Sequence, residues 1–259
     1  MNRRQLLSGS IAAAAALTAP ARVFAQAAPD LRTRRLLDIA QREVERAGPT
    51  LWKRDVVGIA DFGLHSSLPR FHFVNMEAGT TNSVLVSHGS GSDPEHDGWL
   101  NGFSNLPDSW ATSRGAYITW EWYEGRYGTS VRLGGLDESN SNAFPRAIVL
   151  HAAQYATPEH VARWGRAGRS NGCPAFGPEV FPDVLYRLSG GRLIFADKLG
   201  IGAMGEDVAM PYQTEVDFEQ VAADNRAREA AARAEAERTD DDLARIYAEA
   251  NPGLVTSDN

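Results

Sequence analysis

The sequence has 259 residues, of which 26 are Lys or Arg and 33 are Asp or Glu, so its formal net charge at pH 7 is −7. This acidic balance excludes a typical nucleic-acid-binding protein, which would carry a basic surface. The chain contains 1 cysteine, which excludes a disulfide within the chain.

Residues 1–27 have the pattern of a secretory signal peptide. Arg3 and Arg4 give a charged start, residues 11–17 form an alanine-rich apolar core, and Ala25-Gln26-Ala27 is a small-residue cleavage site. The apolar core is too short for a stable membrane span, which needs about 20 residues. The arginine pair resembles a twin-arginine export signal, and Sec export is the alternative. We expect an exported protein of the periplasm or cell envelope, with a net charge of about −10 after cleavage.

Residues 28–53 are expected to contain one helix. Apolar residues recur at helical spacing between Leu31 and Ala47, as in Leu36, Ala40 and Val44. Gly48-Pro49 then predicts the end of the helix. This helix would precede the main domain.

Residues 54–197 are expected to form that domain, mostly β with flanking helices. Short apolar runs alternate with clusters of Gly, Asn, Asp, Ser and Pro, which is typical of a β sandwich or a barrel-like sheet. The expected strands are 56–60, 70–75, 83–87, 116–122, 130–133, 147–151 and 192–195. Helices are predicted at 158–165, with Thr157 as N-cap and Pro158 in the first position, and at 178–189.

Residues 198–259 are expected to be a linker and a charged helical tail. The stretch 216–250 is rich in Ala, Glu, Arg and Asp with sparse apolar positions, and no heptad repeat persists. This favours a solvated helix over a partner-binding coiled coil. A break is predicted near Thr239, where Thr239 or Asp240 could cap a second helical segment.

The single cysteine, Cys173, lies in an irregular loop downstream of His151, which ends an apolar strand-like run. A thiol becomes a nucleophile when a base or a cation favours its thiolate, and Arg166 and Arg169 add positive charge nearby. An unpaired thiol is unusual in an exported protein unless the protein uses it. Cysteine chemistry is therefore the first hypothesis, and a buried inert thiol is the alternative.

Several segments together resemble the YkuD-type L,D-transpeptidase catalytic domain. The strand ending in His151 is followed, 22 positions later, by Arg169-Ser170-Asn171-Gly172-Cys173-Pro174-Ala175, close to the signature Gly-Arg-Ser-x-Gly-Cys-Pro-Ala of one branch. Further similar segments, in the same order as in the family, are 86–91, 103–105, 115–117 and 128–136. The resemblance covers about residues 54 to 197.

The resemblance implies a peptidoglycan L,D-transpeptidase that needs no cofactor and no metal. Cys173 would attack the carbonyl of an L-centre in a stem-peptide donor, release the terminal D-residue, and pass the resulting thioester to an acceptor amine. His151 would be its base, oriented by a backbone carbonyl for which Ala152 is one candidate. Backbone N–H groups of the loop, those of Gly172 and Cys173, would hold the oxyanion. Carbapenem β-lactams would acylate Cys173 as donor mimics.

The same loop and its neighbours supply the remaining candidate residues. Ser170, Asn171 and Gly172 are assigned to the oxyanion loop, and Asn171, where many relatives have His, receives no acid-base role. His88 is interpreted as a substrate-side hydrogen-bonding group or a locally packed turn residue. Arg169 would bind a stem carboxylate or brace the loop. Tyr117 would line the cleft or belong to the core. The residue after the catalytic His is commonly Gly, and the methyl group of Ala152 would narrow the acceptor channel or have no effect.

The other histidines carry weaker signals. His96 lies among Asp93, Glu95 and Asp97, which we interpret as a solvated acidic loop rather than a metal site, since no second His or Cys stands at ligand spacing. His65, His72 and His160 are interpreted as structural.

Three alternatives to the transpeptidase remain at this stage. Water in place of the acceptor amine would give an L,D-carboxypeptidase. An NlpC/P60-type wall peptidase would have Cys before His in the chain, the reverse of the order here. An inactive wall-binding module would leave the Cys and His pair unexplained. The sequence does not distinguish a 3→3 link, a 1→3 link, protein anchoring or exchange of a D-amino acid, nor the oligomeric state.

Overall fold

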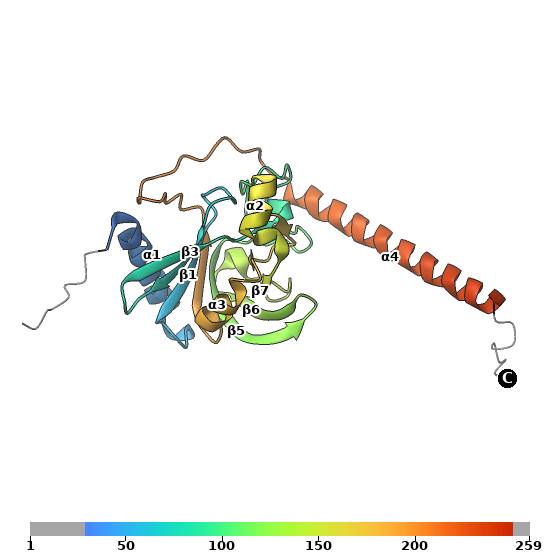
Figure 1. The fold of residues 1–259 in the computed structure, drawn as a ribbon, viewed down its shortest axis with the longest axis horizontal. Helices are drawn as coiled ribbons and strands as arrows, with labels where there is room; N and C mark the ends of the chain where they lie inside the picture. Colours follow the sequence, from blue (N-terminus) through green and yellow to red (C-terminus); the bar gives the residue numbers. More distant parts are fainter. Residues whose placement is uncertain (1–28, 251–259) are drawn as a thin grey trace, which may run out of the picture.

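The computed structural model describes residues 29–250, so the expected signal peptide lies outside the described residues. Eight strands form one curled sheet in the order β3-β2-β1-β10-β5-β6-β7-β9, and β4 pairs with β8 in a second, two-stranded sheet (Figure 1). The main strands are β1 (Val56–Asp61), β2 (Phe71–Asn75), β3 (Thr80–Val84), β5 (Gly115–Gly125), β6 (Gly128–Gly135), β7 (Val149–Ala152) and β10 (Leu193–Asp197). Each overlaps a predicted strand, and the third begins three residues earlier than predicted. The mostly β class with flanking helices is confirmed.

Three short strands were not predicted: β4 (His88–Gly89), β8 (Arg169–Ser170) and β9 (Ala175–Phe176). Strands of two residues carry no periodic pattern, so only their distant partners define them. β4 pairs in parallel with β8, and β9 pairs in parallel with β7. The cysteine loop, residues 171–174, connects β8 to β9. These pairings therefore attach one end of the loop to each sheet.

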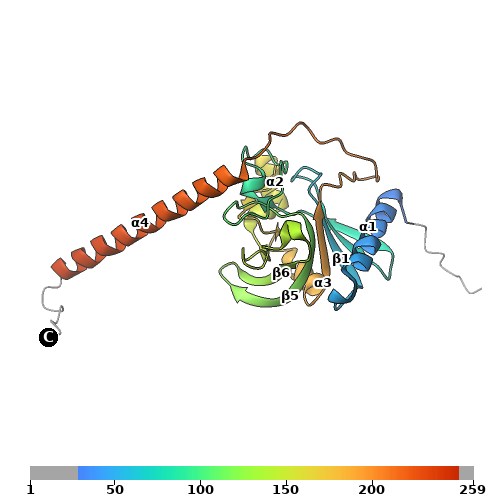
Figure 2. The ribbon, with the colours of Figure 1, turned by 180° about the vertical axis from the view of Figure 1, so that it is seen from behind.

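Helix α1 (Leu31–Ala47) has the bounds predicted from its apolar spacing. The side chain of Asp30 accepts a hydrogen bond from the Thr33 amide and caps its first turn, and Gly48, with φ 55°, ends it. Leu36 and Ala40 are fully buried in a cluster with residues of β1 and β10. The helix therefore covers one face of the sheet, as Figure 2 shows from behind.

The other face of the sheet is covered by helix α3 (Phe181–Leu188), which starts three residues later than predicted. Leu188 and Val184 are fully buried in the second core cluster, with Phe71, Phe176 and Leu150. Cys173 belongs to this cluster as well. Helix α2 (Pro158–Trp164) begins as predicted, since Thr157 Oγ1 accepts from the His160 amide at 3.2 Å. Short 3₁₀ turns occupy Gly48–Thr50, Ser90–Ser92, Glu138–Asn140 and Gln154–Ala156.

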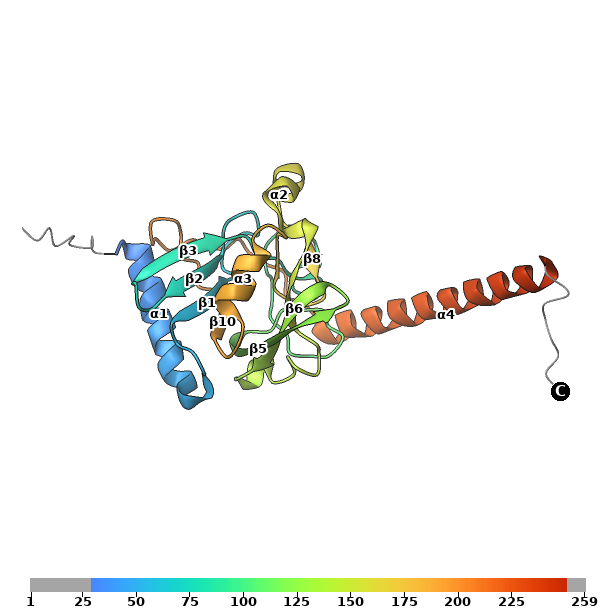
Figure 3. The same cartoon turned by 60° about the horizontal axis from the view of Figure 1, so that its bottom comes forward.

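The tail forms one continuous helix, α4 (Phe218–Ala250), which leaves the body of the molecule after its first turns (Figure 3). The predicted break near Thr239 is wrong. Thr239 Oγ1 donates to the carbonyl of Glu235 at 2.9 Å, so its hydroxyl is satisfied within the helix instead of capping a new one. Within residues 29–250, no helix is long and apolar enough to cross a bilayer.

Candidate active site

The thiol of Cys173 lies against the start of strand β7. Its Sγ accepts a hydrogen bond from the Val149 amide at 3.4 Å and donates to the Ala147 carbonyl at 3.8 Å. His151 follows Val149 by two positions in the same strand, so the two residues share a face of the sheet. The fold therefore brings the predicted nucleophile to the strand that carries the predicted base.

The ring of His151 is oriented by backbone. Its Nδ1 lies 3.0 Å from the carbonyl oxygen of Ala152, the candidate named from the sequence. Since a carbonyl can only accept, Nδ1 carries the proton and Nε2 keeps its lone pair. Tyr127, at the turn between β5 and β6, stacks on the imidazole with ring centroids 4.7 Å apart and an interplanar angle of 26°. His151 is thus a neutral base held on two sides.

Burial sets the protonation state of the pair. Desolvation raises the pKa of the Cys173 thiol to about 11, although the Val149 amide and the cation of Arg146 act in the opposite direction. Desolvation also lowers the pKa of His151. At pH 7 both groups, the thiol of Cys173 and the imidazole of His151, are therefore neutral. The sequence predicted a thiolate favoured by Arg166 and Arg169, but neither of these acts on the thiol, and Arg146 does.

The loop before Cys173 is held by one hydroxyl. Ser170 Oγ donates to the Cys173 carbonyl at 2.6 Å and accepts from the Gly172 amide at 3.1 Å. The Gly172 amide, one of the two expected oxyanion donors, is thereby occupied. The Cys173 amide has no partner among the described residues. Asn171 lies at the surface next to Cys173 in the chain, and both residues line one hollow.

That hollow has a volume of about 400 Å³. Cys173 and Asn171 line it, and Tyr127, Trp110, Arg146 and Glu229 are among the other residues that do so. No sequence motif indicated the last four residues, because their positions in the hollow depend on strand register and on the docking of a helix that is distant in sequence. For Tyr127, one sequence signal was available. The turn Gly125-Arg126-Tyr127-Gly128 directly precedes the strand that pairs with His151.

The structure places His88 and Tyr117 away from the hollow. His88 is 1% exposed, its Nδ1 accepts from the buried guanidinium of Arg70 at 2.7 Å, and its Nε2 donates to Asp93 at 3.1 Å. Burial lowers the pKa of His88 to about 4, so the ring is neutral. Tyr117 is 3% exposed, and its hydroxyl donates to the Ser113 carbonyl at 2.6 Å. Both side chains have their hydrogen-bonding atoms engaged inside the protein.

Arg169 is bound to the neighbouring acidic loop. Its guanidinium donates to the backbone carbonyls of Asp93 and, at 3.4 Å, Pro94. These contacts join β8 to the loop that contains Asp93 and Pro94. The carboxylate of Asp93 accepts from the amides of Asp97 and Gly98. Among residues 29–250, no three His, Cys, Asp or Glu side chains are arranged to hold a metal ion.

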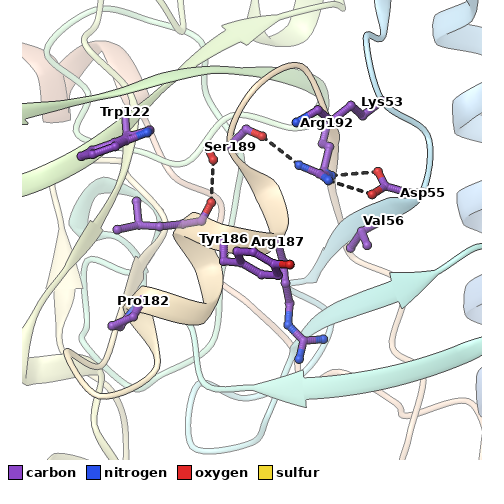
Figure 4. Close-up of a pocket in the computed structure, with 10 residues that line it drawn as sticks. Lys53, Asp55, Val56, Trp122, Pro182, Tyr186, Arg187, Ser189 and Arg192 are labelled. Carbon is purple, nitrogen blue, oxygen red and sulfur yellow. Dashed lines mark hydrogen bonds and ion pairs between the residues drawn. The ribbon is translucent and has the colours of Figure 1, made fainter.

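A second hollow, of about 680 Å³, lies over α3, and Cys173 is not among the residues that line it (Figure 4). Arg192 and Asp55 form a bidentate ion pair on its wall, with N–O distances of 2.9 and 2.7 Å. Trp122 and Tyr186 line it from β5 and α3. The ion pair joins the segment before β1 to the one before β10, which gives it a structural role.

Comparisons with known proteins found similar solved structures and a matching family model. Similar solved structures include an L,D-transpeptidase from Mycobacterium smegmatis (17% identity, TM-score 0.35, 55% of this chain and 58% of that chain covered). Another is L,D-transpeptidase 3 from Mycobacterium tuberculosis with a faropenem-derived adduct (15%, 0.36, 55% and 60%). A third is the helical cell shape determining protein Pgp2 from Campylobacter jejuni (11%, 0.35, 71% and 59%).

The chain spans about three fifths of the length of these structures. No curated protein matches the chain significantly. The family model for the L,D-transpeptidase catalytic domain of the YkuD type matches residues 34–196, which is more than half of the chain. The protein therefore belongs to the YkuD-type L,D-transpeptidase catalytic domain family.

Proposed function

We propose that the protein is an exported peptidoglycan L,D-transpeptidase in which Cys173 is the nucleophile and His151 the base. The observation that carries this proposal is the position of Cys173, which lines the hollow and whose Sγ contacts strand β7, the strand that carries His151 with its Nε2 unprotonated. The proposed place of action is the cell envelope.

The neutral pair determines how the first step proceeds. Because the thiolate is scarce at pH 7, Sγ attacks the L-centre carbonyl of the donor stem as its proton moves to His151 Nε2. The tetrahedral intermediate then collapses, the bond to the terminal D-residue breaks, and His151 returns the proton to the departing amine. A thioester on Cys173 remains.

The oxyanion needs donors that are free in the resting enzyme. We assign the Cys173 amide to this role, with the side-chain amide of Asn171 at the mouth of the hollow as the second donor. Donors aimed at the developing charge are worth about 3 to 4 kcal/mol each in other acyl-transfer enzymes. The Gly172 amide contributes by fixing the loop through Ser170.

His88 and Arg169 act in this proposal through the loop that they hold. In the parallel pairing of β4 with β8, His88 is the register partner of Arg169. Strand β8 shortly precedes Cys173 in the chain. The buried chain of Arg70, His88 and Asp93 fixes β4, and Arg169 ties β8 to the loop at Asp93. We assign Tyr117 to the core because its side chain is buried in the hydrophobic cluster.

The test is intact mass spectrometry of the chain without residues 1–27, incubated with a disaccharide tetrapeptide and separately with a carbapenem. One of the solved structures similar to this chain is an L,D-transpeptidase in complex with imipenem. We expect a covalent adduct on the wild type and none on Cys173→Ala, together with cross-linked muropeptide dimers. His151→Gln should slow adduct formation by at least about 100-fold, the usual contribution of a general base, whereas His160→Gln on α2 should not.

Each outcome of this experiment has a definite meaning. An adduct with shortened tripeptide only would make the protein an L,D-carboxypeptidase. A folded, reduced protein that forms neither adduct nor product would overturn the catalytic assignment and leave a wall-binding module.

A further inference from the structure

The first turns of α4 are packed against the domain beside the cysteine hollow. Ala222 is fully buried and Asn225 is 4% exposed, while the remainder of the helix projects into solvent. Phe218 packs on Gly102 so closely that a Cβ there would lie 2.8 Å from the Phe ring. The segment around residue 102 thus has a shape that accepts this helix.

The helix also holds one wall of the hollow in place. Asn225 Nδ2 donates to the Asp108 carbonyl at 2.8 Å, and Arg226 pairs with the Asp108 carboxylate at 3.5 Å. Asp108 and Trp110 have φ of 62° and 51°, values that favour glycine, so this loop depends on its surroundings for its conformation. Trp110 lines the cysteine hollow and also the neighbouring hollow beneath α4.

One turn beyond Asn225, the side chain of Glu229 lines the same hollow as Cys173. No hydrogen bond or ion pair to its carboxylate is formed by the described residues. The cation that lines the hollow, Arg146, donates instead to Ala111 O, Ser104 O and Ser113 Oγ at 2.6, 2.9 and 2.7 Å. The hollow therefore presents an unpaired anion on its α4 wall, within reach of solvent.

We propose that α4 is part of the active site, and that Glu229 recruits the cationic form of the acceptor amine. This inference rests on the proposed transpeptidase function. The acceptor is a primary amine, which at pH 7 is mostly an ammonium group that a carboxylate binds through a charge-assisted hydrogen bond.

The transfer step that follows balances without any further reactant. The bound ammonium group first loses one proton to solvent. The nitrogen of the resulting free amine then attacks the thioester carbonyl, the new C–N bond forms, and the C–S bond breaks. One proton moves from the nitrogen to Sγ through His151, which restores the thiol. Glu229 contacts only the acceptor, so it is a specificity-determining residue and takes no part in forming the thioester.

The experiment compares Glu229→Gln with the wild type in the full mature chain. Glu235→Gln, on the exposed part of the same helix, is the matched control. Three quantities are measured: the rate of Cys173 acylation by a carbapenem, the KM for a cationic acceptor such as a free D-amino acid amide, and the KM for hydroxylamine, which is neutral at pH 7.

We expect Glu229→Gln to raise the KM for the cationic acceptor by about 5 to 10-fold and to shift the thioester from transfer toward hydrolysis. Acylation and the KM for hydroxylamine should stay within about twofold, since neither involves the charge of Glu229. Added salt should raise the KM for the cationic acceptor in the wild type and have little effect in the variant.

The outcomes separate this inference from the one on which it rests. A wild type that forms no thioester would overturn the proposed function and this inference with it. A wild type that transfers normally, with an unchanged acceptor KM in Glu229→Gln, would overturn this inference alone. Equal losses of acylation and transfer in the variant would also overturn it, because they would place Glu229 in the support of the nucleophile.

Discussion

At the residue scale, the site is set by burial more than by the charges around it. Cys173 is 8% exposed, and its nearest partners are one amide and one carbonyl. A thiolate in this buried site would lose its hydration. One amide donor and the guanidinium of Arg146, which is bound to other groups, do not offset that cost. The folded protein therefore keeps this thiol protonated, and a buried, protonated thiol is protected from oxidation.

The first prediction concerns the pH dependence of this thiol. Because burial raises the pKa of Cys173 to about 11, alkylation by iodoacetamide should be slow at pH 7 and accelerate about tenfold per pH unit up to pH 10. Mass spectrometry of the folded chain at successive pH values measures this rate. The urea-unfolded chain is the control and should level off near pH 9. A plateau below pH 7 in the folded chain would show a stabilised thiolate and contradict the neutral pair.

The second prediction concerns Tyr127, which covers the imidazole of His151. Stacked aromatic pairs contribute about 0.5 to 1.5 kcal/mol, so Tyr127→Ala should slow Cys173 acylation by about 3 to 10-fold, and Tyr127→Phe should preserve the rate. Tyr212→Ala is the matched control, since Tyr212 is 96% exposed. The second-order rate of carbapenem adduct formation measures the effect. Equal rates for Tyr127→Ala and the wild type would remove Tyr127 from the site.

At the element scale, the two-residue strands β4 and β8 set the position of the cysteine loop. Gly89 in β4 approaches the Trp110 carbonyl and the backbone of Gly172 so closely that it has no room for a side chain. Three segments distant in sequence meet there, and two of them carry residues that line the hollow, Trp110 on one and Asn171 and Cys173 on the other. The loop geometry is thus fixed by backbone contact as well as by hydrogen bonds.

The third prediction tests this contact with Gly89→Ala. A Cβ would lie 2.2 Å from the Trp110 carbonyl oxygen and 2.7 Å from the Gly172 Cα, and neither is the flexible end of a side chain. We expect a loss of about 2 to 4 kcal/mol in the free energy of unfolding, because overpacking against backbone forces the chain to move.

Gly79→Ala is the control for this prediction, since its Cβ would meet nothing within 4 Å and its φ of +64° alone adds strain. It should cost about 1 kcal/mol. Urea unfolding of both variants measures the difference. An equal loss in the two would show that the packing at Gly89 relaxes freely.

The same scale explains how much of the fold was predictable. The helix at 31–47 and the cap at Thr157 follow from local patterns, and the structure confirms both. Strand β4 and the docking of α4 have no local signal, since their partners lie far away in the sequence. The break predicted near Thr239 failed because a Thr hydroxyl can bond within a helix as readily as it can cap one.

For the site, sequence motifs named Cys173 and His151, and the structure brings both to strand β7. The motifs could not show that the Gly172 amide is occupied by Ser170, because one rotamer decides it. Tyr127 and Glu229 were missed for a different reason. They enter the hollow through the register of β6 on β7 and through the seating of α4.

At the scale of the whole molecule, acid stability depends on histidines that fold into the interior as neutral rings. His72 is fully buried on β2, where its Nδ1 meets Ser83 Oγ at 2.8 Å, and His88 is buried in the Arg70 and Asp93 network. Burial lowers the pKa of His72 to about 3 and that of His88 to about 4, from 6.5. Both rings can take up a proton in the unfolded chain well before they can in the folded one.

The fourth prediction follows from this difference. Between pH 6.5 and pH 4 the unfolded state binds more protons at these two rings, so the free energy of unfolding must fall as the pH falls. Each histidine with a lowered pKa contributes at most about 1.4 kcal/mol per pH unit to the slope of the free energy of unfolding, and above pH 7 its contribution to stability is fully present.

Urea unfolding at pH 7.5 and pH 4.5 measures the loss of stability. His72→Gln should reduce the pH dependence by roughly 2 to 3 kcal/mol over this range, since glutamine does not titrate. If His72→Gln and the wild type lose the same stability on acidification, protonation of the buried His72 does not limit the acid stability of the fold.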